Sequence, residues 1–169
     1  RLATLVRAVV PIYCSHGRGQ VGEDYKQRVR TLVGLGSHPN VAAALVVSLE
    51  PVTAGRVAEG IRQSGRPVQV IALEEVGGTI KSLEVGIRTL QKMAIAASKL
   101  RRERGRLDEL VVGVKCGGSD GSSGLVSNPA IGMVSDRLVQ AGGTVIMSET
   151  VEWMGGEHIL ARRAVNPQV

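Results

Sequence analysis

Residues 110–129 read LVVGVKCGGSDGSSGLVSNP: an apolar run, then CGGSDGSSG at 116–124, then Asn128 and Pro129. A short apolar run of this kind predicts a buried strand, and the segment rich in Gly and Ser predicts a loop. Asparagine followed by proline favours the start of a helix. The stretch therefore predicts strand, loop and helix in succession, which is the repeating unit of parallel α/β sheets.

The same alternation extends in both directions from this stretch. Further apolar runs predict strands at residues 6–13, 41–49, 68–73 and 144–147. Amphipathic patterns predict helices at residues 22–35, 54–63, 79–104, 129–141 and 157–164. We therefore expect an α/β fold: an open, mostly parallel sheet of about five strands with helices on both faces, a Rossmann-like architecture.

The composition agrees with such a sheet. Aromatic residues make up 2% of the chain and Phe is absent, so the core is built from Val, Leu, Ile, Ala and Met, as in parallel sheets covered by helices. A chain of 169 residues is long enough for one domain, and we expect a single α/β domain over 1–169. Because the sequence begins at Arg1, we expect it to be a fragment of a longer enzyme.

Charge and cysteine content narrow the range of partners. The net charge is +6, but much of the excess lies at residues 99–106, where it is typical of a solvated helix end. With so few aromatic residues to stack on bases, we expect no nucleic-acid partner. No apolar run approaches the roughly 18 residues of a membrane span, so we expect no membrane partner. Cys14 and Cys116 lie far apart in the sequence, which favours a reducing, cytoplasmic location.

In parallel α/β sheets, ligands bind beyond the carboxyl ends of the strands, where the 116–124 loop is expected. Its glycines can adopt positive φ and present backbone amides to an anion. Ser119, Asp120, Gly121 and Ser122 are therefore candidates for holding the carboxylate and hydroxyl groups of a substrate. The sequence leaves three roles open for Cys116: a buried apolar side chain, a metal ligand or a nucleophile.

A second polar segment, ETVEWMGGEH at 149–158, follows the last predicted strand. Elimination of water beside a carboxylate needs a base, an acid and positive charge near the developing enediolate. Glu149, Glu152 and His158 could supply these functions through a bound divalent ion. The alternative is that acidic residues here only favour the start of the last helix. His16, after the first predicted strand, is either a ligand or a turn residue.

A different class of function rests on residues 17–22, GRGQVG, which match the dinucleotide-binding pattern G-x-G-x-x-G. The acidic residue that this pattern requires after the second strand has one candidate, Glu50, about ten residues too late. A nucleotide-binding oxidoreductase therefore stays an alternative, and a non-catalytic organic-acid-binding domain is another.

The motifs together resemble the altronate and galactarate dehydratases. The resemblance is carried by CGGSDGSSG at 116–124, NPAIG at 128–132, GGT at 142–144, GEHIL at 156–160 and RRA at 162–164. HPNV at 38–41 and GGT at 77–79 extend it over nearly the whole chain. Two positions depart from the family pattern: Gln20 and Glu50 lie where the family often has cysteine, which counts against a cysteine-based metal site there.

The resemblance implies a hydro-lyase that removes water from a sugar acid such as altronate or galactarate to give a 2-keto-3-deoxy acid; related members act on sulfolactate. It implies a divalent metal, Fe(II) or Mn(II), and missing N- and C-terminal parts or a small partner subunit; whether the chain forms a homo-oligomer is left open. The assigned residues are, for catalysis, Asp120, Glu149 and His158; for substrate, Ser119, Gly121, Ser122 and Asn128; and for the metal, Cys116, Glu152 and His16.

Overall fold

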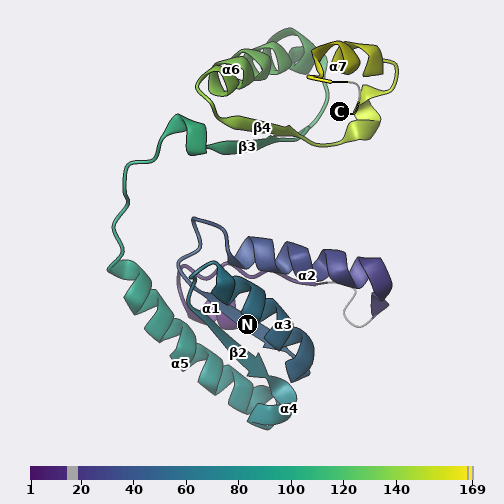
Figure 1. The fold of residues 1–169 in the computed structure, drawn as a ribbon. Coiled ribbons are helices and arrows are strands. Elements are labelled where there is room, and N and C mark those ends of the chain that lie inside the picture. The colour runs from purple at the N-terminus through teal and green to yellow at the C-terminus, as the bar shows by residue number, and fades with distance from the viewer. Residues whose placement is uncertain (15–18, 167, 169) are drawn as a thin grey trace. The chain divides into compact units, whose positions relative to one another are not determined.

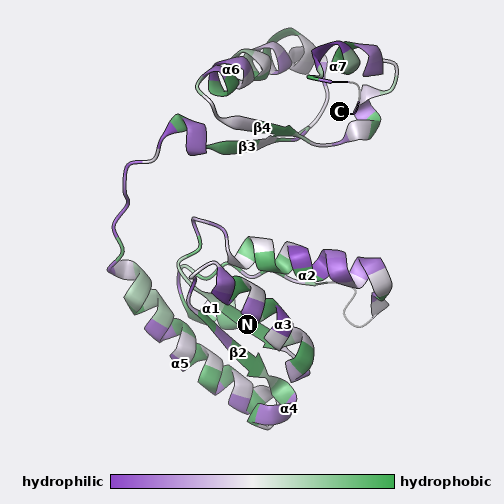
Figure 2. Cartoon of the chain, in the orientation of Figure 1, coloured by the Kyte–Doolittle hydropathy of each residue, from purple (hydrophilic) through white to green (hydrophobic). Residues whose placement is uncertain are grey.

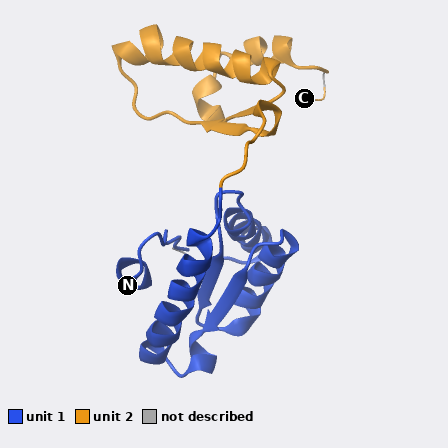
Figure 3. Ribbon diagram, turned by 90° about the vertical axis from the view of Figure 1, so that its left-hand side faces the viewer, with its two compact units in different colours: residues 1–101 blue, residues 102–169 orange. Residues whose placement is uncertain are grey.

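The computed structural model describes residues 1–14, 19–166 and 168. It divides into two compact units, Arg1–Arg101 and Arg102–Val169 (Figure 3). A single domain over 1–169 was predicted, but hydrophobic patterns identify strands and helices without showing which of them share a core. Each unit is described below by itself.

Unit 1 is a two-stranded parallel sheet with helices around it (Figure 1). Its elements follow in the order α1 (Leu2–Leu5), α2 (Gly22–Gly36), β1 (Ala44–Ser48), α3 (Pro51–Gln63), β2 (Val68–Ala72), α4 (Leu73–Val76) and α5 (Thr79–Ser98). β1 and β2 pair from Ala44 opposite Val68 to Ser48 opposite Ala72. The helices predicted at 22–35 and 54–63 and the strands at 41–49 and 68–73 are confirmed to within a few residues.

The core of unit 1 lies between this sheet and α3. Val57, Ala58 and Ile61 of α3 are buried against Val68 of β2. Ile71 points to the other face of the sheet, because side chains alternate along a strand, and there it approaches Gly86 of α5. Helices α3 and α5 therefore cover opposite faces of β2, as the apolar patterns predicted.

The prediction of a strand at residues 6–13 is wrong. After α1 the chain turns at Ala8, which has φ 67°, and residues 9–14 form neither helix nor strand. Apolar, β-branched residues indicate a surface suited to a sheet but do not supply a pairing partner. Pro11 lacks the amide hydrogen that a ladder would use.

The charged stretch 101–106 joins the two units. It was predicted to be the end of a helix reaching residue 104, but α5 ends at Ser98. Residues 99–106 have no regular structure, and Figure 2 shows this connection as largely hydrophilic. Three arginines within four residues repel one another, and Gly105 is a poor helix former, so the helix stops before them.

Unit 2 has a second pair of parallel strands. Its elements follow in the order η2 (Leu107–Glu109), β3 (Val111–Val114), η3 (Ser123–Ser127), α6 (Asn128–Gln140), β4 (Thr144–Met147), η4 (Thr150–Trp153) and α7 (Glu157–Arg163). β3 and β4 pair from Val111 opposite Thr144 to Val114 opposite Met147. Leu138 of α6 is buried, whereas Ile146 and Met147 of β4 are more than half exposed.

The protein is thus a mixed α/β structure with parallel strands, as predicted, but the strands do not form the expected single five-stranded sheet. Among the described residues, β1 pairs with β2 and β3 pairs with β4, giving two sheets of two strands each. Sequence patterns located all four strands; the pairing of β3 with β4 is decided by contacts that no local pattern records. Within the described ranges, no helix is both long and apolar enough to cross a bilayer.

Candidate active site at the end of strands β3 and β4

The candidate site lies where β3 and β4 end. Because the two strands are parallel, the residues that follow them, Cys116 and Glu149, leave the sheet at the same edge. The Ser148 amide donates to the Val114 carbonyl over 3.2 Å, and the Ser148 hydroxyl donates to the same oxygen over 2.9 Å. The Cys116 amide then donates to Glu149 Oε2 over 3.0 Å. These bonds extend the strand pairing into the two loops and fix Glu149 beside Cys116.

Glu149 has an unusual backbone conformation. Its φ and ψ are 62° and 58°, in the left-handed region that residues other than glycine seldom adopt. The conformation costs roughly 1–2 kcal/mol relative to ordinary backbone. It turns the chain from β4 into the 3-10 turn 150–153, whose Glu152 amide donates to the Glu149 carbonyl over 3.0 Å. Strained residues of this kind concentrate at functional sites, which makes Glu149 a strong candidate.

Three possible metal-binding groups meet at this edge. One ligand atom from each of Cys116, Glu149 and Glu152 lies within 4.8 Å of the others. Cys116 and Glu149 are partly buried, and Glu152 is exposed. The Cys116 thiol also lies 3.5 Å from the Ser119 hydroxyl. Cys116, Ser119, Glu149 and Glu152, all selected from the sequence, are therefore brought together by the fold.

Lys115 is a member of this site that sequence reasoning missed. Its ammonium lies 3.3 Å from Glu149 Oε1, and it donates to the Cys116 carbonyl over 2.6 Å. The Glu149 carboxylate is thus held by an amide on one oxygen and a cation on the other. The sequence contained a usable signal, since Lys115 directly follows a predicted strand, but a single lysine there is also an ordinary surface residue.

Asp120 occupies the start of a helix in this structure. Its Oδ1 accepts from the Ser122 amide over 2.8 Å, the Ser122 hydroxyl over 2.6 Å and the Ser123 amide over 3.1 Å. These contacts are those of an N-cap, and the chain is helical from Gly121 onward, through the π-helical segment Ser123–Ser127 into α6. The α-helix α6 begins at Asn128, as predicted, but helical backbone already precedes it from Gly121, and Asn128 itself is exposed.

The glycines of the loop do not take the conformation that was predicted for an anion nest. None of Gly117, Gly118, Gly121 and Gly124 has a positive φ, and an added Cβ at any of them would meet open space. For Gly121 and Gly124 the reason is the early helix start, because right-handed helical backbone has negative φ. Ser119, Gly121 and Ser122 are nonetheless exposed, and Ser119 lies beside the Cys116 thiol.

Of the two predicted histidines, the structure describes only His158, which is not part of the cluster. His158 is exposed in the first turn of α7, and the metal-binding group found in the described part of the chain does not include it. The neighbouring Glu157 accepts from the Gly155 amide over 2.8 Å, in keeping with the alternative that acidic residues favour this helix start. His16, together with Gly17 and Arg18 of the dinucleotide pattern, lies outside the described residues.

The hydrogen bonds to Asp120 lead to a testable pH dependence. The Ser122 hydroxyl, followed by the amides of Ser123 and Ser122, lowers the pKa of Asp120 below its ordinary 3.8. The cap is therefore complete above pH 3.8 and is lost as the pH falls through the lower pKa of the folded chain. An NMR titration following the Ser122 and Ser123 amides should give a midpoint below 3.8, and Asp120→Asn should abolish that step. A midpoint at or above 3.8 would contradict the cap.

Family models identify the two parts of the chain. The second-domain model of D-galactarate dehydratase/altronate hydrolase matches residues 3–98, and the C-terminal model of D-galactarate/altronate dehydratase matches residues 107–169. The chain belongs to the galactarate/altronate dehydratase family. The two family matches coincide closely with units 1 and 2, so the resemblance predicted from the sequence motifs is confirmed.

Curated relatives in this family carry different names. The chain is 38% identical over 168 residues to the (2R)-sulfolactate sulfo-lyase subunit beta of Chromohalobacter salexigens, covering 99% of this chain and 43% of that protein. It is 34% identical over 156 residues to the altronate dehydratase of Bacillus subtilis, covering 91% of this chain and 31% of the relative. It is 46% identical over 87 residues to the galactarate dehydratase (L-threo-forming) of Escherichia coli, covering 52% of this chain and 16% of that relative. No solved structure is significantly similar to it.

The chain therefore spans less than half the length of these family members. These relatives are named as a sulfo-lyase subunit and as dehydratases, not as the nucleotide-binding oxidoreductase that residues 17–22 suggested. Membership in the family applies to both units, whereas the cluster of Cys116, Glu149 and Glu152 lies in unit 2 alone.

Proposed function

We propose that this chain supplies part of the active site of a lyase that removes a leaving group from a sugar acid or a related 2-hydroxy acid. The observation that carries the proposal is the convergence of Cys116, Glu149 and Glu152 at the carboxyl ends of β3 and β4. Family membership supports the reaction class. The activity belongs to the longer enzyme, or to the assembly with a partner subunit, of which this chain is a part.

The donor set at the cluster fits a divalent transition metal. A metal ion about 2.0–2.3 Å from each of three donors requires those donors to lie within roughly 4.6 Å of one another, close to the separation found here. A sulfur donor beside two carboxylates favours Fe(II) over Mn(II), since thiolate is the softer ligand. Cys116 and Glu152 would hold the ion, and the Glu149 carboxylate would lie beside it. When bound, it would supply positive charge that stabilises the enediolate of a substrate carboxylate.

The chain's own residues would carry the proton transfers. In the elimination, a base takes the proton from the carbon next to the carboxylate, the C–O bond at the following carbon breaks, and the departing hydroxide is protonated to water. The resulting enol tautomerises to the 2-keto-3-deoxy acid. We assign proton transfer to Glu149, oriented by Lys115 and the Cys116 amide, together with Asp120 and His158. Ser119, Gly121, Ser122 and Asn128 would hold the substrate's carboxylate and hydroxyl groups.

A second leaving group is favoured by one observation. The relative that aligns with 99% of this chain is named a sulfolactate sulfo-lyase subunit. In that variant of the reaction the base again takes the proton next to the carboxylate, but a C–S bond breaks and sulfite departs with its electron pair. The same enediolate stabilisation serves both reactions. The leaving group of the substrate therefore determines whether water or sulfite is released, and the same cluster at the ends of β3 and β4 could serve both reactions.

The test is a substrate panel on the complete enzyme that contains this chain. Altronate, galactarate and (2R)-sulfolactate are supplied separately with Fe(II), and formation of a 2-oxo acid and of sulfite is followed. A 2-oxo acid without sulfite indicates a dehydratase, and both products together indicate a sulfo-lyase. Chelation should abolish turnover and added Fe(II) should restore it. Absence of a 2-oxo acid from all three acids would refute the lyase proposal and leave an organic-acid-binding domain.

We place this activity in the cytoplasm. Both cysteines are free thiols, Cys14 exposed and Cys116 partly buried, and a thiol ligand persists in a reducing compartment.

A further inference from the structure

The sequence contains two pairs of adjacent arginines, Arg101–Arg102 and Arg162–Arg163. All four residues are exposed. An endoprotease that recognises paired basic residues therefore meets the same two side chains at both places. The pairs differ in backbone conformation and in what their side chains bind, and these differences decide which pair a protease can use.

The first pair lies in the connector between the units, residues 99–106 (Figure 1). The last turn before it closes where the Leu100 amide donates to the Ala97 carbonyl over 3.1 Å. Over residues 101–105 the backbone is irregular and makes no hydrogen bond with any residue that the structure describes. Exposed segments of this kind are the preferred sites of proteolytic cleavage, because a protease can bind them without first unfolding the chain.

The arginine side chains of the connector differ at its two ends. Three of them make no hydrogen bond or ion pair within the described part of the chain: Arg101, Arg102 and Arg104. Arg106, in contrast, donates from Nε to Asp108 Oδ1 over 2.9 Å, and its amide donates to Glu109 Oε2 over 2.9 Å. The accessible part of the connector therefore ends before Arg106.

The second pair forms the end of helix α7, Glu157–Arg163. Arg162 Nε donates to the His158 carbonyl over 3.3 Å, and Arg163 Nη2 lies 3.5 Å from Asp136 Oδ1. The Ala164 amide, directly after the pair, donates to the Leu160 carbonyl over 3.0 Å. A protease can bind this pair only after the end of the helix has opened.

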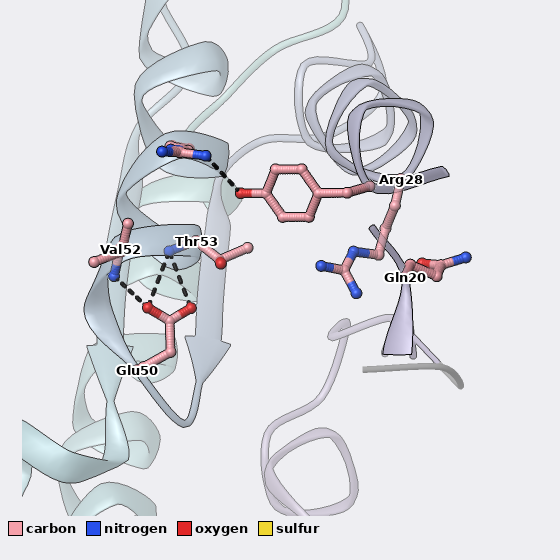
Figure 4. Close-up of a pocket in the computed structure, with 7 residues that line it drawn as sticks. Gln20, Arg28, Glu50, Val52 and Thr53 are labelled. Carbon is pink, nitrogen blue, oxygen red and sulfur yellow. Dashed lines mark hydrogen bonds between the residues drawn. The ribbon is translucent and has the colours of Figure 1, made fainter. Parts of the chain in front are cut away.

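Cleavage in the connector leaves the core of unit 1 whole. Among the described residues, the buried hydrophobic side chains of unit 1 all lie at or before Leu90 of α5. Figure 4 shows the start of α3, where the Glu50 carboxylate accepts from the Val52 amide over 2.7 Å and from the Thr53 amide over 3.1 Å. These contacts form within unit 1, so the polypeptide up to residue 102 retains its buried side chains and this helix cap.

We propose that the bond after Arg102 is the site at which an endoprotease specific for paired basic residues cuts this chain, dividing it between its two family domains while unit 1 stays folded. Hydrolysis adds one water across the Arg102–Glu103 peptide bond and leaves a carboxylate on Arg102 and an amine on Glu103. The cut disconnects unit 1 from the segment that carries Cys116, Glu149 and Glu152. It does not depend on the lyase proposal, so either proposal can fail without the other.

The experiment digests the full chain with a catalytic amount of an endoprotease specific for paired basic residues. Intact mass and N-terminal sequencing identify the products that begin at Glu103 and at Ala164. Synthetic peptides of residues 96–108 and 157–169 give the reference rates of the same two bonds outside the fold. Relative to these rates, the bond after Arg102 should be cut at least about tenfold faster than the bond after Arg163, because only the second site must open first.

Two variants and one further measurement test the reason for the difference. Arg102→Gln should abolish the product that begins at Glu103. Asp136→Asn removes the ion pair of Arg163 and should speed cleavage there by no more than about fivefold, the most that an exposed pair contributes. Hydrogen exchange of the α3 amides should be the same in the cleaved and the uncut chain.

Three results would overturn the proposal. The first is that no product beginning at Glu103 forms. The second is that both bonds, relative to their peptides, are cut at the same rate in the folded chain. The third is that the α3 amides lose their protection when the connector is cut, which would show that unit 1 does not survive the cleavage.

Discussion

Replacing Glu149 by Gln is expected to lower kcat by about 10²- to 10⁴-fold in the enzyme that contains this chain, the range for removing a group that transfers protons. The amide has the size of the carboxylate and can still accept the bond from the Cys116 amide, but it loses the negative charge paired with Lys115. It also removes one anionic donor from the group formed with Cys116 and Glu152, so bound metal should fall in parallel. Steady-state kinetics and metal analysis measure the two effects.

A second substitution at the same position distinguishes function from folding. Glu149→Gly removes the carboxylate but suits the left-handed backbone found there. The relief of roughly 1–2 kcal/mol of strain is partly offset by the greater flexibility of unfolded glycine. Stability measured by urea unfolding should therefore be unchanged or higher while turnover is lost. Glu103→Gln, in the exposed connection between the units, is the matched control and should leave kcat unchanged.

Full activity in Glu149→Gln would remove this residue from the mechanism. A large loss of stability in Glu149→Gly would show instead that the carboxylate is needed to hold the two loops together.

Ile61→Ala is expected to destabilise unit 1 by about 2–5 kcal/mol, the usual cost of emptying a buried aliphatic site. Ile61 is 2% exposed and packs in the cluster of Val57, Ala58 and Val68. Helix α3, which carries Ile61, packs against both β1 and β2. Few atoms can therefore move into the cavity that the substitution leaves. A loss of this size is a large fraction of the stability of an ordinary domain, and partial unfolding at 37 °C should follow.

The measurement is urea unfolding followed by far-UV circular dichroism, with hydrogen exchange of the α3 amides to locate the loss in unit 1. Ile80→Ala is the control, because Ile80 is 85% exposed at the start of α5 and its truncation opens no cavity. Equal effects of the two substitutions would mean that Ile61 does not anchor the core described above.

Features that depend only on neighbouring residues were predicted from the sequence more accurately than features that depend on distant contacts. The runs at 68–73 and 144–147 predicted β2 and β4 almost residue for residue, since short runs of apolar and β-branched residues favour strands. The run at 6–13 carried the same mark and is not a strand, because pairing requires a partner at the right place. Asp120 was predicted to hold substrate and to act in catalysis, and in the structure its carboxylate accepts the hydrogen bonds that cap the helix starting at Gly121.

At the candidate site, too, local patterns predicted some residues and long-range contacts decided the others. Cys116 and Glu149 were chosen because each follows a predicted strand, and parallel pairing of β3 with β4 then brought them together. Lys115 was marked only by its place after a predicted strand, and no sequence pattern indicated the left-handed backbone of Glu149. Arg28 and Arg56, which line one hollow in unit 1, were not selected from the sequence, because they lie on different helices and surface arginines are common.

By itself, the sequence determined the family, the α/β class, four strands, the main helices and the residue types at the strand ends. These are properties of segments a few residues long, in which burial, capping and turn chemistry act between near neighbours. Only the tertiary structure decided that the strands pair two by two in two compact units, that Cys116, Glu149 and Glu152 meet, and that Arg28 and Arg56 from different helices approach the same tyrosine ring. Those outcomes depend on contacts between residues distant in the chain, whose free energies no local pattern encodes.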